Sequence, residues 1–204
     1  MNDLVGRTAL VTGSTHGIGR EVAVALAAAG GRVAVHGRSA EAAAEVATLL
    51  ARDDRHAGTF LADLADSSAV ENLIAEVGRR LPELDTLVLV AGADVLTGPP
   101  AKWTFERKLE QLLRVDVVST MLLARGLGRW MQDREGGSIV TIGWDQAATG
   151  MEGDSGELFA ATKGVVMAFT KSLAKSFAPA NRGTAARATC TTTASISSRG
   201  YQAR

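Results

Sequence analysis

Short, nearly continuous apolar runs alternate along the chain with longer stretches in which apolar residues recur every three or four positions. The short runs predict buried strands at 8–12, 32–36, 59–62, 86–90 and 138–142. The longer stretches predict helices at 19–29, 39–51, 66–80, 105–131 and 157–178, with Ser39 capping the second. Strands without polar alternation are buried on both faces of a sheet. The pattern therefore predicts an α/β fold, with a doubly wound parallel sheet between two layers of helices.

The pattern stops near residue 178 and divides the chain into two parts. Residues 1–178 are predicted to form one domain, because a stretch of this length suits a single hydrophobic core. Residues 179–204 are rich in Thr, Ser, Ala and Arg, and Ile196 is their only large aliphatic residue. Such a segment buries too little apolar surface to offset the entropy of ordering. We expect a poorly ordered tail there.

Composition limits the compartment and the partners. The 22 Lys and Arg residues balance the 22 Asp and Glu residues, so no basic field predicts nucleic acid or an anionic membrane as a partner. Cys190 is the single cysteine, which excludes an internal disulfide and favours a reducing compartment. The first residues lack the pattern of a signal peptide, and no apolar run reaches the roughly 18 residues of a membrane span. We expect a cytoplasmic protein.

A glycine-rich turn follows the first predicted strand and opens the first predicted helix. Its residues are Gly13, Ser14, Thr15, His16, Gly17, Ile18 and Gly19. The first glycine permits a tight exit from the strand, the second lets the backbone approach a pyrophosphate, and the third lets the helix pack closely. The helix N-terminus adds free N–H groups and the positive end of its dipole. Between a strand and a helix, such a turn predicts a dinucleotide-binding Rossmann domain.

The TGxxxGxG spacing of this turn resembles the short-chain dehydrogenase/reductase family, and the resemblance covers about residues 5–178. Further matching elements follow in the family's order, and they comprise Asp63-Leu64, Ala91-Gly92, and Phe159 with Lys163. The first pair is similar to the family's adenine-contacting acid and its neighbour, although Asp63 taken alone would be interpreted as a loop carboxylate before a helix. The second pair is similar to the end of the Asn-Asn-Ala-Gly element, whose two Asn positions are apolar here. The third falls on the Tyr-x-x-x-Lys element.

The resemblance implies an NAD(P)-dependent oxidoreductase that transfers a hydride between the cofactor and a small carbonyl or alcohol substrate, similar to the 3-oxoacyl reductases. The end of the second strand bears on the cofactor. NAD enzymes usually place an acidic residue there for the ribose 2′-hydroxyl, whereas this chain has Arg38 and no acid. A guanidinium pairs well with a 2′-phosphate, which favours NADP over the alternative, NAD. The other interpretation of Arg38 is a solvated loop arginine.

The expected catalytic residues differ from the family's. The family uses a Tyr to transfer the substrate proton, a Lys to hold the nicotinamide ribose, a Ser to orient the carbonyl and an Asn to support a water relay. By the resemblance, Lys163 is retained, Phe159 takes the Tyr position and Asp116 takes the Asn position. The Ser position falls near Trp144 or Asp145. For Lys163, a solvated lysine near a helix start is the alternative interpretation.

The loss of the tyrosine matters because general acid catalysis typically contributes about 10²–10⁴-fold. The chain's single tyrosine, Tyr201, lies in the predicted tail. Asp145 is the preferred replacement acid, because a carboxyl group beside an apolar ring can serve as a general acid. Asp154 and Glu157 are interpreted instead as residues of a helix start, with Asp154 or Ser155 as the N-cap.

Two further expectations come from the resemblance. The family continues after its last catalytic helix with two strands and a substrate lid, so the change of pattern near residue 181 predicts a truncation or a change of reading frame. The apolar helices at 115–123 and 165–169 correspond to the family's dimer interface, which predicts a homodimer unless these faces only cover the sheet.

Three functional hypotheses remain open. They are a divergent NADP-dependent oxidoreductase with an altered proton relay, a non-catalytic nucleotide-binding relative, and a fragment without activity of its own. Lys163 favours the first hypothesis, whereas Phe159 and the missing strands favour the other two.

Overall fold

Five parallel strands form the single sheet of the computed structural model, which describes residues 3–134 and 137–177. The strands are β1 (Thr8–Thr12), β2 (Arg32–Gly37), β3 (His56–Leu61), β4 (Thr86–Leu89) and β5 (Ser138–Thr141). They lie in the order β3-β2-β1-β4-β5. The order changes direction between β1 and β4, and ligands of such sheets bind outside the carboxyl ends of the strands at this point.

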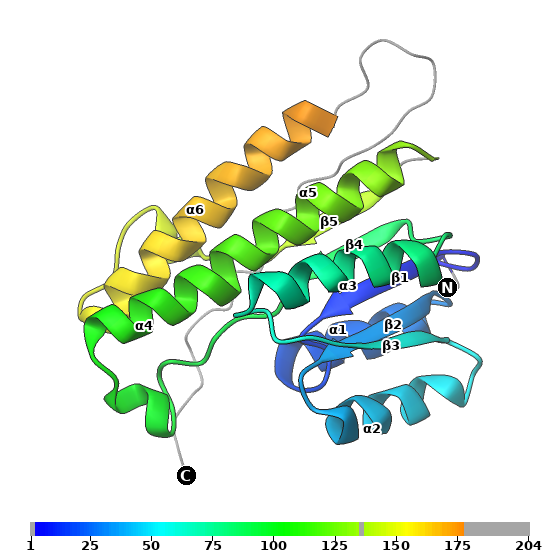
Figure 1. Cartoon of the computed structure of the whole chain (residues 1–204), viewed down its shortest axis with the longest axis horizontal. Coiled ribbons are helices and arrows are strands. Elements are labelled where there is room, and N and C mark those ends of the chain that lie inside the picture. Colours follow the sequence, from blue (N-terminus) through cyan, green and yellow to red (C-terminus); the bar gives the residue numbers. More distant parts are fainter. Residues whose placement is uncertain (1–2, 135–136, 178–204) are drawn as a thin grey trace.

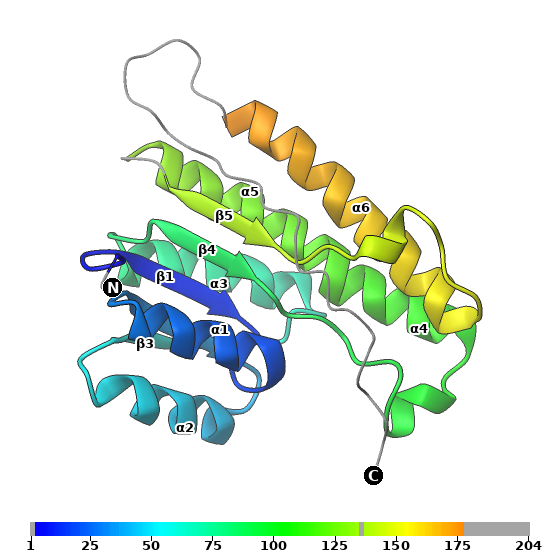
Figure 2. The ribbon, with the colours of Figure 1, turned by 180° about the vertical axis from the view of Figure 1, so that it is seen from behind.

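Helices cover both faces of the sheet, as Figures 1 and 2 show from opposite sides. One layer holds α1 (Gly17–Ala28) and α2 (Ala40–Ala51). The other holds α3 (Ser67–Arg80), α5 (Ser119–Gln132) and α6 (Asp154–Phe177), and α5 packs between the other two. The prediction of a doubly wound α/β/α fold is confirmed.

The predicted helix at 105–131 is continuous but not uniform. It begins as α4 (Phe105–Leu112), passes through a π-helical segment at Leu113–Val118, and continues as α5. π-Helical turns are rare and frequently occur at functional sites. Periodicity alone cannot find such a segment, because six residues are too few to establish a second period.

Local polar contacts determine where several helices begin. The Ser39 hydroxyl accepts a hydrogen bond from the Ala42 N–H, as predicted for an N-cap. Asp66 caps α3 in the same way. The N-cap prediction for α6 was wrong, because Asp154 is the first helical residue and Ser155 the second, and the Glu157 N–H bonds to the Gly153 carbonyl. The interpretation of Asp154 and Glu157 as acids of the helix start is confirmed, since both lie in the first turn. Asp154 therefore lies in the first turn of the helix, near the positive end of its dipole.

β3 begins three residues earlier than its apolar run predicted. Its pairing with β2 is irregular between Val33 and Ala34, and Gly58 takes a φ of +147°. These irregularities interrupt the apolar pattern that marks a strand, so only its second half was recognisable from sequence. The predicted tail at 179–204 lies outside the described residues.

Within the described ranges, no helix is both long and apolar enough to cross a lipid bilayer. The same residues contain no group of histidine, cysteine or acidic side chains arranged to hold a metal ion.

The larger apolar core lies between the sheet and the layer formed by α3, α5 and α6. Leu127 of α5 is fully buried within it. Replacing Leu127 with Ala should lower the free energy of unfolding by about 3 kcal/mol, because it removes buried contacts and leaves a cavity. Urea unfolding followed by circular dichroism measures the loss. Leu61→Ala, at a half-exposed position at the end of β3, is the control and should cost under about 1 kcal/mol. Equal losses in the two variants would contradict this placement of the core.

Candidate nucleotide and catalytic site

The glycine turn between β1 and α1 depends on close contacts that only glycine permits. Gly13 has a φ of +65°, and a Cβ atom there would lie 2.9 Å from the Cα atom of Ala91. A Cβ atom at Gly19 would overlap the carbonyl group of Gly13. The turn therefore packs directly on the segment that follows β4, and α1 packs directly on the turn.

His36 and Ser14 join this turn to β2. The Gly13 N–H donates to His36 Nδ1 at 3.2 Å, and the Ser14 N–H donates to the His36 carbonyl at 3.0 Å. The Ser14 hydroxyl accepts from the His36 N–H at 3.0 Å. Both side chains are buried. The hydroxyl and N–H of Ser14 are thus used within the protein, and Ser14 positions the turn on the neighbouring strand.

Burial lowers the pKa of His36 from its usual 6.5 to about 4, while the nearby backbone of Ala62 opposes this shift. The imidazole is therefore neutral near pH 7, so Nδ1 can accept the bond from Gly13 while Nε2 carries the proton.

Thr12 makes the corresponding connection to β4. Its hydroxyl oxygen accepts hydrogen bonds from the N–H groups of Val90 and Ala91, at 3.1 and 3.2 Å. This places the Ala91-Gly92 segment beside the glycine turn.

The N-terminus of α1 is open to a ligand. His16 takes the N-cap position, but no side chain caps the first amides of this helix. Around Gly17, which has a φ of +53°, no heavy atom lies within 4 Å of where a Cβ would be. The exposed amides and the free space fit a phosphate group. The side chains of Thr15 and His16 hydrogen bond to each other at 3.1 Å, and Ile18 is exposed beside them.

Arg38, Asp63 and Leu64 follow the ends of β2 and β3 at the same edge of the sheet. Arg38 is exposed and forms no ion pair with a described residue. The Asp63 carboxylate accepts a hydrogen bond from the Ala65 N–H at 3.0 Å, which is the local role of a loop carboxylate before a helix. The Leu64 side chain is buried in the core.

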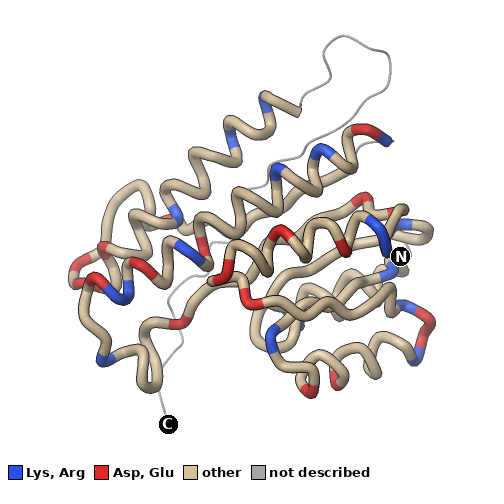
Figure 3. The backbone as a smooth tube through the Cα atoms, viewed as in Figure 1, with Lys and Arg blue, Asp and Glu red and all other residues tan. Residues whose placement is uncertain are grey.

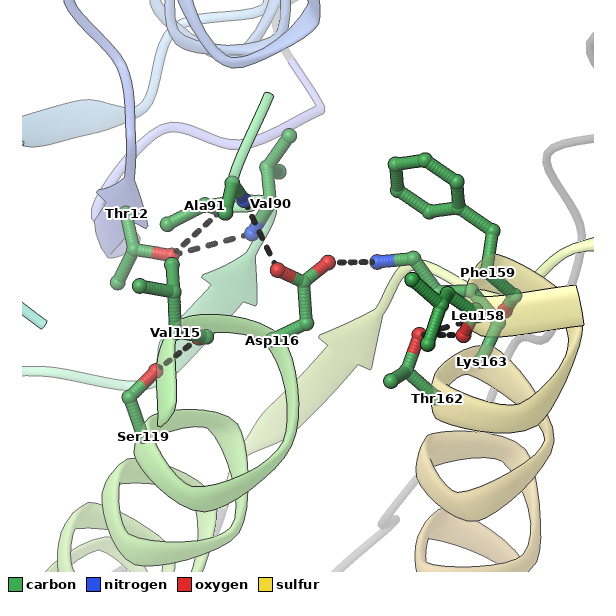
Figure 4. Close-up of polar contacts among 11 residues, drawn as sticks. Thr12, Val90, Ala91, Val115, Asp116, Ser119, Leu158, Phe159, Thr162 and Lys163 are labelled. Atoms are coloured by element: carbon green, nitrogen blue, oxygen red, sulfur yellow. Dashed lines mark hydrogen bonds and ion pairs between the residues drawn. The ribbon is translucent and has the colours of Figure 1, made fainter. Parts of the chain in front are cut away.

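The other part of the candidate site lies around Lys163, and Asp116 is at its centre (Figure 4). The π-helical segment carries it to the exit of β4, where one carboxylate oxygen accepts from the Ala93 N–H at 2.8 Å. The other carboxylate oxygen accepts from Lys163 Nζ at 2.9 Å. The Asp116 side chain is only 1% exposed and that of Lys163 15% exposed. The structure thus joins the predicted residues Asp116 and Lys163 in a largely buried ion pair.

Phe159 begins the helical turn that ends at Lys163, and its ring projects from α6 above the lysine side chain (Figure 4). The Phe159 ring lies 6.4 Å from that of Trp144, edge to face at 75°. Both rings are half-buried. Asp145 follows Trp144 but is exposed, and its carboxylate accepts from the Gln146 N–H. Among the described residues, no hydrogen bond or ion pair joins Asp145 to Lys163 or Asp116.

The structure also identifies two positioning residues that sequence reasoning missed, Thr12 and His36. Both lie at the last or next-to-last position of a buried strand, where a polar residue interrupts an apolar run. That interruption was the available signal.

Comparison with known proteins identifies the family. The sequence model for short chain dehydrogenases matches residues 7–199. The chain belongs to this family. Over 176 residues it is 33% identical to the 2,3-dihydro-2,3-dihydroxybenzoate dehydrogenase of Bacillus subtilis (strain 168), an alignment that covers 86% of this chain and 66% of that protein.

Solved structures of short-chain dehydrogenases superimpose closely on this one. The 3-oxoacyl (acyl-carrier-protein) reductase of Agrobacterium tumefaciens C58 with NADP bound gives a TM-score of 0.75 at 31% identity, covering 86% of this chain and 66% of that one. A short chain dehydrogenase from Burkholderia cenocepacia J2315 in complex with NADP gives 0.74 at 34% identity, covering 85% and 69%. The chain spans about two thirds of the length of these relatives.

Replacing Asp116 with Ala should lower the free energy of unfolding by about 3 kcal/mol, because it leaves the largely buried Lys163 ammonium and the Ala93 N–H without their shared partner. Asp116→Asn is the matched variant and should lose less, since its side-chain oxygen can still accept from Ala93. Urea unfolding at pH 7 measures both. A loss below about 1 kcal/mol for Asp116→Ala would show that the pair does not support the fold.

Stability should also depend on His36 as the pH falls. Between the unfolded pKa of 6.5 and the folded pKa of about 4, the unfolded chain binds the proton more readily. Acidification from pH 6.5 to 4 should therefore remove about 3 kcal/mol of stability through this residue, with little further change from it below pH 4. The measurement is the difference in unfolding free energy between the wild type and His36→Asn across this range. A constant difference would contradict the assignment of a neutral, buried imidazole.

Proposed function

We propose that the protein is an NADP(H)-dependent oxidoreductase that transfers a hydride between the cofactor and a small organic substrate. The observation that carries this proposal is the direct connection between the glycine turn and the lysine. Gly13 packs on Ala91, and two residues later Ala93 bonds to the carboxylate that holds Lys163. Residues 91–93 thus fix the position of the glycine turn, which would bind phosphate, relative to the Lys163 ammonium of α6.

The residues present fit a dinucleotide. The uncapped amides of α1 and the space at Gly17 would hold the pyrophosphate. Two ammonium protons of Lys163 remain beyond its bond to Asp116 and would bind the nicotinamide ribose hydroxyls. When bound, the nicotinamide supplies or accepts the hydride. Asp63 and Leu64 would contact the adenine from the end of β3.

NADP is favoured over NAD because the only charged residue directly after β2 is Arg38. Its guanidinium is exposed and has no ion-pair partner among the described residues, so it is available for a 2′-phosphate. Two solved relatives hold NADP, which agrees with this choice.

A carbonyl substrate, which the family resemblance implies, also needs a proton. Phe159, in the place where the family has its tyrosine, cannot supply one. Asp145 remains the proposed replacement, although reaching the site would require its exposed side chain to turn away from Gln146. A nucleotide-binding protein without turnover is the second candidate function, and the ring of Phe159 is the observation that favours it.

Arg38→Ala should weaken NADPH binding about 10- to 100-fold and leave NADH binding within about 2-fold, because the guanidinium meets only the extra phosphate. Titration of nucleotide fluorescence measures both affinities. Arg52→Ala, at the far end of α2, is the matched control and should change neither. Equal weakening of NADPH and NADH would contradict the assignment of Arg38, and no binding of either nucleotide to the folded wild type would overturn the proposed function.

A further inference from the structure

We propose that the substrate is an iminium cation, reduced at its C=N⁺ bond to an amine, rather than a neutral ketone. The inference rests on the proposed function, because it needs a bound reduced nicotinamide, and it specifies the substrate class of that site. It comes from the Phe159 ring above Lys163 and the Trp144 ring packed on it, from the charge of the residues around them, and from the proton requirement of each kind of substrate.

The first observation is the chemistry of Phe159, whose ring lies above the Lys163 side chain, and of Trp144, which packs on that ring. Phe159 and Trp144 are half-buried and lie edge to face. Phe159 also packs on the apolar cluster that contains Val95 and Leu158. Neither ring carries a group that donates a proton to a substrate oxygen. Within the described ranges there is no tyrosine, since the chain's single one is residue 201.

The second observation is the charge around these rings. The Lys163 ammonium is compensated by the Asp116 carboxylate at 2.9 Å, so this ion pair adds no net charge that would repel a cation. Four acidic residues gather where α6 begins (Figure 3), and the sequence between Ser138 and Thr162 contains no Lys or Arg; the four are Asp145, Glu152, Asp154 and Glu157. None of them forms an ion pair with a described residue. α4 packs on α6 and carries two acids and two bases, namely Glu106, Glu110, Arg107 and Lys108. Acids therefore outnumber bases around the start of α6, and this region attracts cations and disfavours anions.

Aromatic faces and nearby acids favour the same ligand. The face of a tryptophan or phenylalanine ring attracts a cation within about 6 Å of its centre, and the attraction grows as the cation loses water. A half-buried pair of rings provides this partly desolvated surface. The neutral oxygen of a ketone gains nothing comparable from it.

A ketone and an iminium cation differ in whether their reduction requires a proton. Reduction of a ketone needs a hydride at carbon and a proton at oxygen. An iminium carbon needs only the hydride: a C–H bond forms, the C=N π pair becomes the lone pair of nitrogen, and no proton moves. The product is a neutral amine. A site with phenylalanine beside its lysine can therefore complete this reduction, whereas a ketone would require an added acid.

The inference predicts a clear preference. With NADPH, the wild type should reduce the permanently charged N-methyl-dihydroisoquinolinium ion with a kcat/KM at least about 100-fold above that for the similarly sized ketone 1-tetralone, because general acid catalysis typically contributes 10²–10⁴-fold. Binding supplies a readout that is independent of turnover. In the presence of NADP⁺, the non-reducible N,N-dimethyl-tetrahydroisoquinolinium ion should bind more tightly than 1-tetralone, as followed by tryptophan fluorescence.

Two variants test the role of Phe159. Phe159→Leu keeps the apolar volume but removes the aromatic face, and it should weaken binding of the non-reducible cation about 5- to 20-fold. Phe169→Leu, further along α6, is the matched control and should leave this binding unchanged. Phe159→Tyr places a hydroxyl beside Lys163 and should raise ketone reduction at least about 10-fold while iminium reduction persists.

The outcomes separate the inference from the function on which it rests. NADPH binding together with ketone reduction equal to or faster than iminium reduction would overturn the inference and support the proposed function. NADPH binding without turnover of either substrate, and with equal affinities for the cation and 1-tetralone, would also overturn it and favour the non-catalytic binder. Absence of NADPH binding to the folded protein would reject both proposals.

Discussion

The buried carboxylate of Asp116 is the contact on which the candidate site depends. It joins three segments that are distant in sequence: the π-helical turn that carries it, the exit of β4 through the Ala93 N–H, and α6 through Lys163. A carboxylate this deeply buried is stable only with charged or hydrogen-bonding partners. Its two oxygens have them, so the position of the lysine relative to the sheet is set by the need to compensate a buried charge.

The other half of the site depends on close packing of the backbone rather than on charge. Gly13 lies against Ala91, and Thr12, Ser14 and His36 bond the turn to the strands on either side. These contacts leave the amides at the start of α1 as the polar groups free to face a ligand. Ala91 contacts the glycine turn and Ala93 bonds to Asp116. The same short segment after β4 therefore positions both the turn and the Asp116–Lys163 ion pair.

Sequence reasoning succeeded where a single local rule applies. Continuous apolar runs gave the five strands, the glycine spacing gave the turn, and Ser39 gave a helix start. It failed where the outcome depends on tertiary contacts. The first residues of β3 were missed because the irregular pairing with β2 is decided between strands, and the positioning roles of Thr12 and His36 require knowledge of which strands are neighbours.

Around Lys163, too, sequence reasoning succeeded where a local rule applies and failed where tertiary contacts decide. The four-residue spacing of Phe159 and Lys163 placed both on one face of a helix from sequence. That Asp116 would bond to Lys163, across 47 positions of the chain, could be obtained only from the folded arrangement. The edge-to-face contact of Phe159 with Trp144 likewise depends on how the loop after β5 returns to α6.

The π-helical segment has a consequence for how related sequences are aligned. A turn closed by i→i+5 bonds contains one residue more than an α-helical turn, and each residue of an α-helix advances about 100° around its axis. The side chains of α5 are therefore rotated by about that angle from where a uniform continuation of α4 would put them. A homologue with ordinary winding here would need a one-residue gap inside an unbroken helix, and a gapless alignment would assign buried α5 positions to its solvent-facing residues.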